Sequence, residues 1–213
     1  LLFPPESAEP GDRLAELRTI HCPIVAIDQH WPGHDFDYVG CDNRRGMHDL
    51  VTFLIGKGYR RFGVISFPET SSGAERRQGF LEAMFEHNLP VDASLLTVAD
   101  GSFRGAYDTA RALLERSDRP EVLVCFNDYL AREALNAAWD LKLRVPEEVA
   151  VTGFGNLPLC ELVRPRLTTV EQSPFDTGVA AARLLLERIS STGNMERRDV
   201  IIPTRVIPRN STR

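Results

Sequence analysis

The stretch EVLVCFNDYLAREALNAAWD, residues 121–140, joins an apolar run directly to an amphipathic segment. Val122–Phe126 is short and continuously apolar, which is typical of a strand covered on both faces. Asn127 and Asp128 come next and offer the capping side chain that a helix needs at its start. After them, one helical face collects Leu130, Ala134, Leu135 and Ala138. The stretch therefore predicts a buried strand that leads into a helix.

The same alternation of apolar runs and helix-length segments extends along most of the chain. The other apolar runs are Ile24–Ile27, Phe62–Phe67, Leu95–Ala99, Val149–Phe154 and Val200–Ile207. The helix-length segments are Asn43–Lys57, Gly73–His87, Arg104–Arg116, Asp128–Lys142 and Phe175–Ile189. Strands joined by crossovers of this length run parallel, so the pattern predicts an α/β fold of mainly parallel, doubly wound sheets.

The composition is that of an ordinary globular protein. Of the 213 residues, 43% are hydrophobic and 26% are charged, and the length is enough for two lobes of about 100 residues each. No apolar run approaches the roughly 18 residues of a membrane helix, so we expect no membrane partner. The start at Leu1–Pro5 is too short for the apolar region of a signal peptide and is predicted to be the rest of a strand.

The cysteines and the charge narrow the class of protein further. Cys22, Cys41, Cys125 and Cys160 form no C-x-x-C pair, which favours reduced thiols and a cytoplasmic location. The net charge is −5, and the arginines are spread along the chain. A protein that holds DNA needs a basic face, so we expect this segment alone not to bind DNA.

Sequence motifs for catalysis, cofactors and metals are absent. No apolar run is followed by G-x-G-x-x-G, and neither G-x-x-x-x-G-K-[ST] nor G-x-S-x-G occurs. Three of the five histidines lie between His21 and His34, where Pro32 and Gly33 predict a loop rather than a metal-binding helix. We therefore expect no cofactor, no metal and no catalytic residues, and the sequence favours a binding protein over an enzyme.

Polar residues stand where the predicted strands end. Asp28, Ser66, Asp100, Asn127 and Asn156 each follow an apolar run. Ligands of open parallel sheets bind at these ends, near the point where the strand order reverses. The same residue types also cap the helix that follows a strand. The sequence thus predicts a binding site at the strand ends, and capping stays open as the alternative role of each residue.

Several segments, in the same order along the chain, resemble the LacI family of bacterial transcription regulators. They are PIVAID (residues 23–28), VGCDNRRG (39–46), LIGKGYRRFGVI (54–65), SGAERRQGF (72–80), FND (126–128), RVPEEVAVTGF (144–154), PRLTTVEQ (165–172) and RNST (209–212). Together they extend over most of the chain. The resemblance implies the effector-sensing part of a repressor, with a two-lobed fold like that of the periplasmic binding proteins.

The resemblance also implies how the lobes are built from the chain. Residues 1–40 and 172–198 would form the first lobe, and residues 41–171 and 201–213 the second, with an effector in the cleft. The chain begins near the third strand of the family, so the DNA-binding head and the start of the first lobe are expected to be missing from it. The implied protein is a homodimer whose absent head binds operator DNA.

Carried over position by position, the resemblance predicts a set of ligand-binding residues: Arg76, Asp28, Asn127, Gln172, Phe103, Ser72 and Asn156. Arg76 lies in SGAERRQGF, and a planar guanidinium can clamp a carboxylate or a pair of hydroxyls. The alternative role of Arg76 is that of a solvent-exposed residue on the helix surface, as expected for Arg77. Asp28 would accept hydrogen bonds from ligand hydroxyls or be a loop residue. Gln172 would contact the ligand or brace the crossover.

Two positions depart from the family pattern. Gly155 stands where sugar-responsive members carry an aspartate, and Gly101 where they carry an aromatic ring, for which Phe103 is the candidate replacement. Because that carboxylate is missing, an anionic effector is more plausible here than at a site that carries it. The effector is thus expected to be sugar-like or a small organic anion.

Two other functions stay open at this point. A periplasmic sugar-binding protein has the same fold, and an enzyme can be built on any doubly wound sheet. The four unpaired cysteines and the segments LTTV (167–170) and RNST favour the repressor over the periplasmic protein. In a repressor, effector binding shifts the protein between two arrangements and so changes its affinity for the operator.

Overall fold

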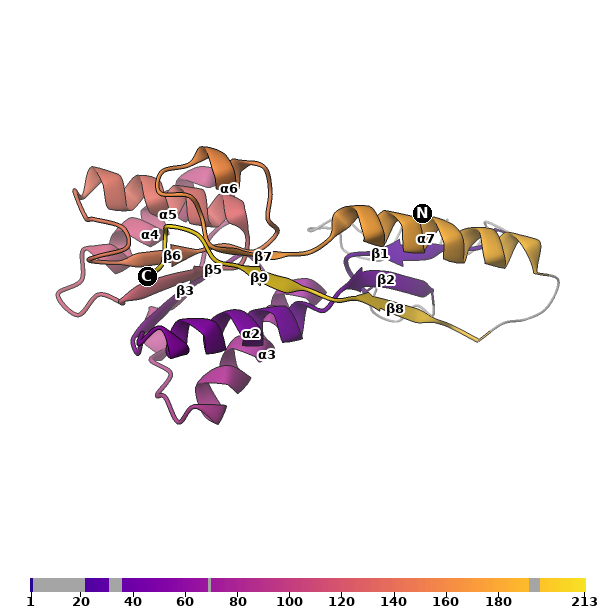
Figure 1. Ribbon diagram of the computed structural model, residues 1–213, viewed down its shortest axis with the longest axis horizontal. Coiled ribbons are helices and arrows are strands. Elements are labelled where there is room, and N and C mark those ends of the chain that lie inside the picture. Colours follow the sequence, from indigo (N-terminus) through magenta and orange to yellow (C-terminus); the bar gives the residue numbers. More distant parts are fainter. Residues whose placement is uncertain (2–21, 31–35, 69, 192–195) are drawn as a thin grey trace. The chain divides into compact units, whose positions relative to one another are not determined.

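A computed structural model describes residues 1, 22–30, 36–68, 70–191 and 196–213 (Figure 1). The strand remainder predicted at Leu1–Pro5 lies outside these residues apart from Leu1, and so do His21 and His34. The chain divides into two compact units. Unit 1 is formed by Leu1–Asp42, Thr70–Ser72 and Ser173–Pro203, and unit 2 by Asn43–Glu69, Gly73–Gln172 and Thr204–Arg213.

A four-stranded parallel sheet forms the centre of unit 2. Its strands are β3 (Phe62–Ser66), β4 (Leu96–Val98), β5 (Val122–Cys125) and β6 (Ala150–Thr152), in the order β4-β3-β5-β6. Every residue of β5 is buried, as its continuous apolar sequence predicts. Two further strands, β7 (Thr169–Glu171) and β9 (Arg205–Ile207), form an antiparallel pair.

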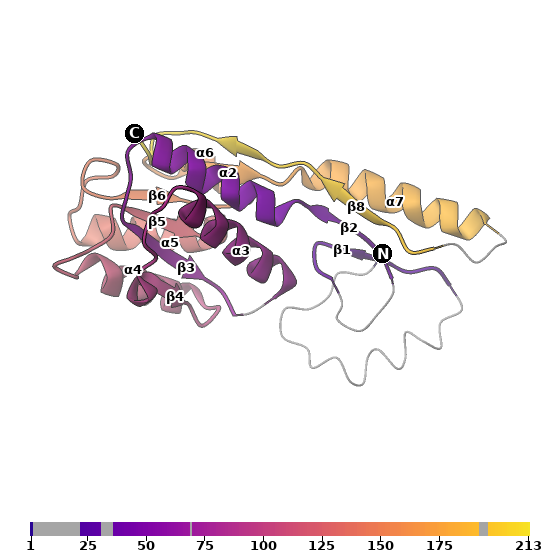
Figure 2. The same cartoon turned by 90° about the horizontal axis from the view of Figure 1, so that it is seen from below.

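Helices cover both faces of the unit 2 sheet (Figures 1 and 2). On one face lie α2 (Asn43–Gly56) and α3 (Ser71–Glu86), and on the other α4 (Phe103–Leu114) and α5 (Asp128–Asp140). Two short helices, the 3-10 turn η1 (Ala93–Leu95) and α6 (Leu159–Leu162), complete the unit. The helices bury their apolar faces, including Leu50 and Leu54 of α2. The expected α/β fold with parallel, doubly wound strands is confirmed.

Unit 1 contains a smaller parallel sheet and one long helix. Its strands are β1 (Val25–Ile27), β2 (Asp37–Cys41) and β8 (Asp199–Ile202), in the order β1-β2-β8. Helix α7 (Pro174–Ser190) packs on this sheet. Ala181 and Leu184 of the helix form a buried cluster with Val25 and Val39.

The single strand predicted over Val200–Ile207 is two strands. Residues up to Ile202 pair with β2 in unit 1, and residues from Arg205 pair with β7 in unit 2. Pro203 stands between them and has no backbone N–H to continue a ladder. An apolar run alone does not tell which of two sheets each of its residues joins.

An ion pair with little solvent exposure ties α7 to the start of β2. The Arg188 guanidinium donates to both Asp37 oxygens, at 2.5 and 2.6 Å, and the backbone N–H of Arg198 donates to Asp37 at 2.8 Å. Burial alone would raise the pKa of Asp37, but these hydrogen bonds and charges outweigh it and lower the pKa. The ionised carboxylate therefore stabilises unit 1 at neutral pH.

Replacement Arg188→Ala is expected to destabilise unit 1 in a pH-dependent manner. Because the folded-state pKa of Asp37 is lowered, its contribution is complete above the ordinary carboxyl pKa and disappears as the pH falls through the folded value. Urea unfolding measures the free energy of unfolding of the unmodified chain and of Arg188→Ala between neutral pH and about pH 3. The two values should differ at neutral pH and converge in acid. Arg183→Ala, an exposed change on the same helix, is the control and should leave the pH profile unchanged.

Candidate functional site

The strand order of unit 2 reverses between β3 and β5. From β3 the chain crosses to β4 on one side and then returns to β5 on the other. At such a point the connections diverge and leave room for a ligand at the carboxyl ends of the strands. Phe67 follows β3 and Phe126 follows β5, and their rings meet edge to face with centroids 6.2 Å apart. We call this edge the strand-end site, formed by Phe67, Arg76, Phe126, Asn127 and Phe154.

Arg76 reaches the strand-end site from α3. Its Nη1 donates to the carbonyl of Phe126 at 2.5 Å, and its Nε donates to Oδ1 of Asn43 at 2.9 Å. The guanidinium lies 4.1 Å from the centre of the Phe154 ring, which follows β6. Only 5% of Arg76 is exposed, whereas Arg77 is exposed. The structure thus holds the Arg76 cation in a fixed orientation at the ends of three strands.

Asn127 both caps α5 and faces the end of β5. Its Oδ1 accepts from the backbone N–H of Leu130 at 2.8 Å, so the capping role predicted as the alternative is present. Its Nδ2 makes no hydrogen bond within the described part of the chain. The amide can therefore still donate to a bound molecule while its oxygen holds the helix.

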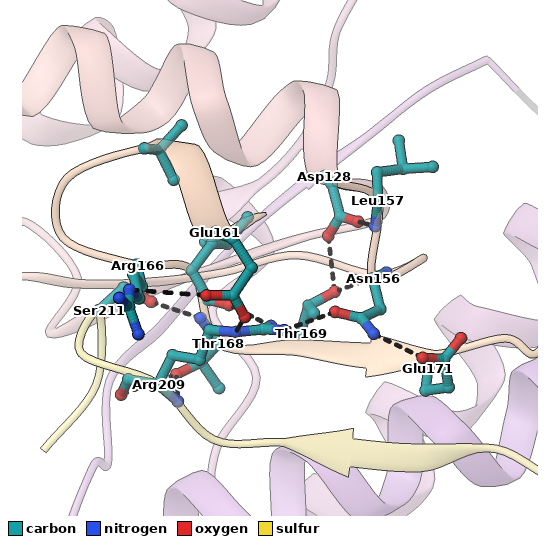
Figure 3. Close-up of polar contacts among 12 residues, drawn as sticks. Asp128, Asn156, Leu157, Glu161, Arg166, Thr168, Thr169, Glu171, Arg209 and Ser211 are labelled. Atoms are coloured by element: carbon teal, nitrogen blue, oxygen red, sulfur yellow. Dashed lines mark hydrogen bonds and ion pairs between the residues drawn. The ribbon is translucent and has the colours of Figure 1, made fainter. Parts of the chain in front are cut away.

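Asn156 holds three chain segments together (Figure 3). Its Nδ2 donates to Glu171 of β7 at 2.5 Å, and its Oδ1 accepts from Arg209 at 2.8 Å. Arg209 also donates to Glu161 of α6 and to the carbonyl of Leu167. A direct contact of the Asn156 amide with a ligand, as the sequence predicts, would compete with these bonds.

Asn156→Ala is expected to lower the free energy of unfolding of unit 2 by about 1–3 kcal/mol, because two amide hydrogen bonds are lost. Asn156 also has a φ of +54°, which asparagine and glycine tolerate better than alanine. Asn156→Gly should therefore cost less than Asn156→Ala, although both lose the amide. Urea unfolding measures the difference, and equal losses for the two variants would contradict the backbone part of this argument.

Asp128 is a fully buried carboxylate beneath the strand-end site. It accepts from the Thr169 hydroxyl at 2.6 Å and from the backbone N–H of Leu157 at 2.8 Å (Figure 3). Burial raises its pKa above the ordinary carboxyl value, partly offset by these bonds. Burial and the neighbouring Asp128 also raise the pKa of the Cys160 thiol to about 12. From the sequence Asp128 is only a candidate cap, and nothing there indicates these distant partners.

Gly155 lies beside Asp128 and Gln172. A Cβ at this glycine would stand 3.0 Å from Oδ2 of Asp128 and 3.4 Å from Oε1 of Gln172, and the glycine φ is +134°. The Gln172 side chain thus lies near the end of β6.

Phe103 lies at the first turn of α4 and is 57% exposed. Its ring lies 5.8 Å from that of Tyr129, and the Arg132 guanidinium lies 4.7 Å from the centre of the Phe103 ring.

Asp28 and Ser72 belong to unit 1. Asp28 has a φ of +69°, and its carbonyl accepts from the Tyr38 hydroxyl at 3.1 Å. Ser72 is buried and lies 3.2 Å from the Thr70 hydroxyl. The His30 ring stacks on that of Tyr38 at 3.6 Å, an aromatic pair that the sequence does not predict.

Of the predicted ligand-binding residues, the structure brings Arg76 and Asn127 together at the strand-end site, and Asn156 and Gln172 beside Gly155.

Comparison with known proteins gives the family. The sequence profile described as periplasmic binding protein-like domain matches residues 51–212. The HTH-type transcriptional repressor PurR of Escherichia coli O1:K1 is 33% identical over 193 residues, which cover 90% of this chain and 56% of the relative. A LacI-family regulatory protein of Chloroflexus aggregans has a similar structure, with a TM-score of 0.84 and 30% identity over 94% of this chain and 72% of the other.

The chain belongs to the LacI family, as an effector-binding domain of the periplasmic-binding-protein-like type. It spans little more than half the length of the curated relatives that it matches. A LacI-family regulator of Enterococcus faecium, solved with bound ribose, has a TM-score of 0.81 and 27% identity, and the match covers 89% of this chain and 70% of the other. The resemblance to LacI regulators stated from sequence motifs is confirmed, and these relatives are transcription regulators rather than enzymes.

Two kinds of feature are absent from the described residues of this LacI-family chain. None of its helices there is long and apolar enough to cross a membrane. Within those same ranges, no three or more His, Cys, Asp or Glu side chains are grouped so that they could hold a metal ion.

Proposed function

We propose that this chain senses a small-molecule effector and that the strand-end site of unit 2 is where the effector binds. The observation that supports this most strongly is the Arg76 cation, fixed by Asn43 and Phe126 at the reversal of strand order. A guanidinium held in one orientation loses little entropy when it binds, and its fork matches paired oxygen acceptors. Phe67, Phe126 and Phe154 provide apolar walls around it.

Membership of the family supports proposals for further contacts and for the biological role. We propose that units 1 and 2 are the two lobes, and that Asp28, Ser72, Phe103, Asn156 and Gln172 contribute to effector recognition. Effector binding would favour one conformation of the regulator and thereby change operator binding by a helix-turn-helix head. The whole protein would act in the cytoplasm as a homodimer, with the exposed Leu162 of α6 as one candidate contact.

A periplasmic sugar-binding protein is the alternative function. The relatives named above are transcription regulators, which favours the repressor. The E. faecium relative was solved with ribose, so a sugar-like effector stays within the proposal, together with a small organic anion.

A ligand screen with matched variants tests this proposal. Sugars, nucleobases, amino acids and organic acids are added to the 213-residue chain, and the melting temperature is recorded, because a ligand stabilises the state that it binds. A compound that binds at the proposed site should stabilise the unmodified chain and Arg77→Gln, but not Arg76→Gln. Equal stabilisation of all three proteins by every active compound would place binding away from Arg76 and refute the proposed site.

A further inference from the structure

One side of α7 is buried in unit 1, and another side exposes a line of apolar residues. The buried residues of the helix are Thr177, Ala181 and Leu184, and α7 packs on β1 and β2 (Figure 1). The exposed apolar residues, which we call the α7 stripe, are Phe175, Val179, Ala182, Leu186 and Ile189. Phe175 is 81% exposed and Leu186 is 63% exposed, so large apolar side chains of the stripe stand in water.

The spacing of the α7 stripe is that of a contact between two helices. From Phe175 to Ile189 its members follow one another at intervals of four, three, four and three residues. Apolar residues that repeat every 3.5 residues on average are typical of a helix that packs along a second helix. A helix that only covers its own sheet needs one apolar side. The stripe is a second apolar side, and its period indicates a helical partner.

Two charged residues that flank the α7 stripe have no ion-pair partner in the part of the chain that the structure describes. They are Asp176 and Arg183, each of which is exposed and directly follows a stripe residue. Glu187 and Arg188, the other charged residues of α7, form ion pairs within unit 1. Residues seven apart are separated by about two helical turns and lie on the same side of the helix. The stripe is therefore bordered by one negative and one positive charge.

We propose that the α7 stripe is a contact between two copies of this chain, with the two α7 helices antiparallel. A two-fold axis that passes between Val179 and Ala182 brings Asp176 of each copy against Arg183 of the other. Because a two-fold contact contains each pair twice, both charges of both copies become paired. The same axis lays the apolar side chains of the two stripes against each other. A parallel arrangement would instead set like charges at the same level.

The contact is weak and separate from the other surfaces discussed above. A single pair of helices buries less area than a standard protein–protein interface, so we expect dissociation on the order of 100 µM. The stripe belongs to unit 1, whereas Leu162 of α6, the other candidate for self-contact, belongs to unit 2. The contact needs no effector, so its failure would leave the proposed function of the strand-end site intact.

Charge variants test the contact by sedimentation velocity of the 213-residue chain at about 10–500 µM. The unmodified chain should form more dimer as the concentration rises. Asp176→Lys and Arg183→Glu each set like charges across the contact, so each variant alone should stay monomeric. An equal mixture of the two variants should dimerise again, because every charge then meets its opposite. A monomeric mixture, or single variants that dimerise as well as the unmodified chain, would overturn the proposal.

Apolar variants test the stripe itself. Leu186→Asp should abolish the dimer, whereas Phe85→Asp, a matched change at an 84% exposed residue of α3, should leave it unchanged. Both side chains are exposed, so neither change should unfold the chain, and circular dichroism at low concentration checks this. A dimer that persists in Leu186→Asp and is lost in Leu162→Ala would place the contact on α6 and overturn the proposal. An unmodified chain that is monomeric at every concentration would also overturn it.

Discussion

Replacement Asp128→Ala is expected to lower the free energy of unfolding of unit 2 by about 2–4 kcal/mol. The change leaves the buried Thr169 hydroxyl and the half-buried Leu157 N–H without their acceptor, and an unsatisfied buried group costs about 1–3 kcal/mol. Urea unfolding followed by tryptophan fluorescence measures the loss. Asp140→Ala removes an exposed carboxylate from the end of the same helix and should cost less than about 1 kcal/mol.

The stability that Asp128 contributes depends on pH, and this dependence provides a second, independent result. Because burial raises the folded-state pKa of Asp128, the folded protein binds its proton more tightly than the unfolded chain does. This contribution to stability is complete below the ordinary carboxyl pKa and declines as the pH rises through the folded value. Asp128→Asn should remove that decline. Asp37 has the opposite sign, since its lowered pKa makes unit 1 lose stability as the pH falls.

Replacement Arg76→Ala is expected to weaken effector binding by about 2–4 kcal/mol, because ligand oxygens lose a charge-assisted pair. The same change should lower the stability of unit 2 by about 1–3 kcal/mol, since the Phe126 carbonyl and Oδ1 of Asn43 lose their donor. Arg77→Ala should affect neither quantity by more than about 0.5 kcal/mol. Calorimetric titration measures the binding loss, and urea unfolding the stability loss.

The two losses must be separated before the Arg76 result is interpreted. Titrations should be made at a temperature where both variants are fully folded, as judged by circular dichroism. If the fully folded Arg76→Ala protein binds the effector as tightly as the unmodified chain does, Arg76 supports the fold and does not contact the effector. A loss of binding in a fully folded Arg76→Ala protein supports direct contact.

The sequence predicts the elements of unit 2 that are long or continuously buried. β5 and α5 fit their predicted ranges because an unbroken apolar run followed by an Asn cap has one favourable local structure. β7 was not predicted, because Thr169–Glu171 is too short for any periodicity to emerge. The division of residues 199–207 between two sheets depends on pairing partners distant in sequence, which no local pattern contains.

The candidate site was predicted in part. Arg76 was selected from a motif, but its bonds to Asn43 and to the Phe126 carbonyl depend on how α2, α3 and β5 pack. For Asn127 the sequence left capping and ligand binding open, and the structure shows the cap. Asp128 was missed as the centre of a buried network, because Thr169 lies 41 residues away along the chain.

The crystal structure of the chain with the compound that stabilises it most tests the central claim most directly. We predict ligand density within hydrogen-bond distance of the Arg76 guanidinium and the Asn127 Nδ2, at the carboxyl ends of β5 and β6. Density instead in the surface pocket lined by Trp139, Leu143 and Arg164, with Arg76 untouched, would contradict the assignment of the strand-end site.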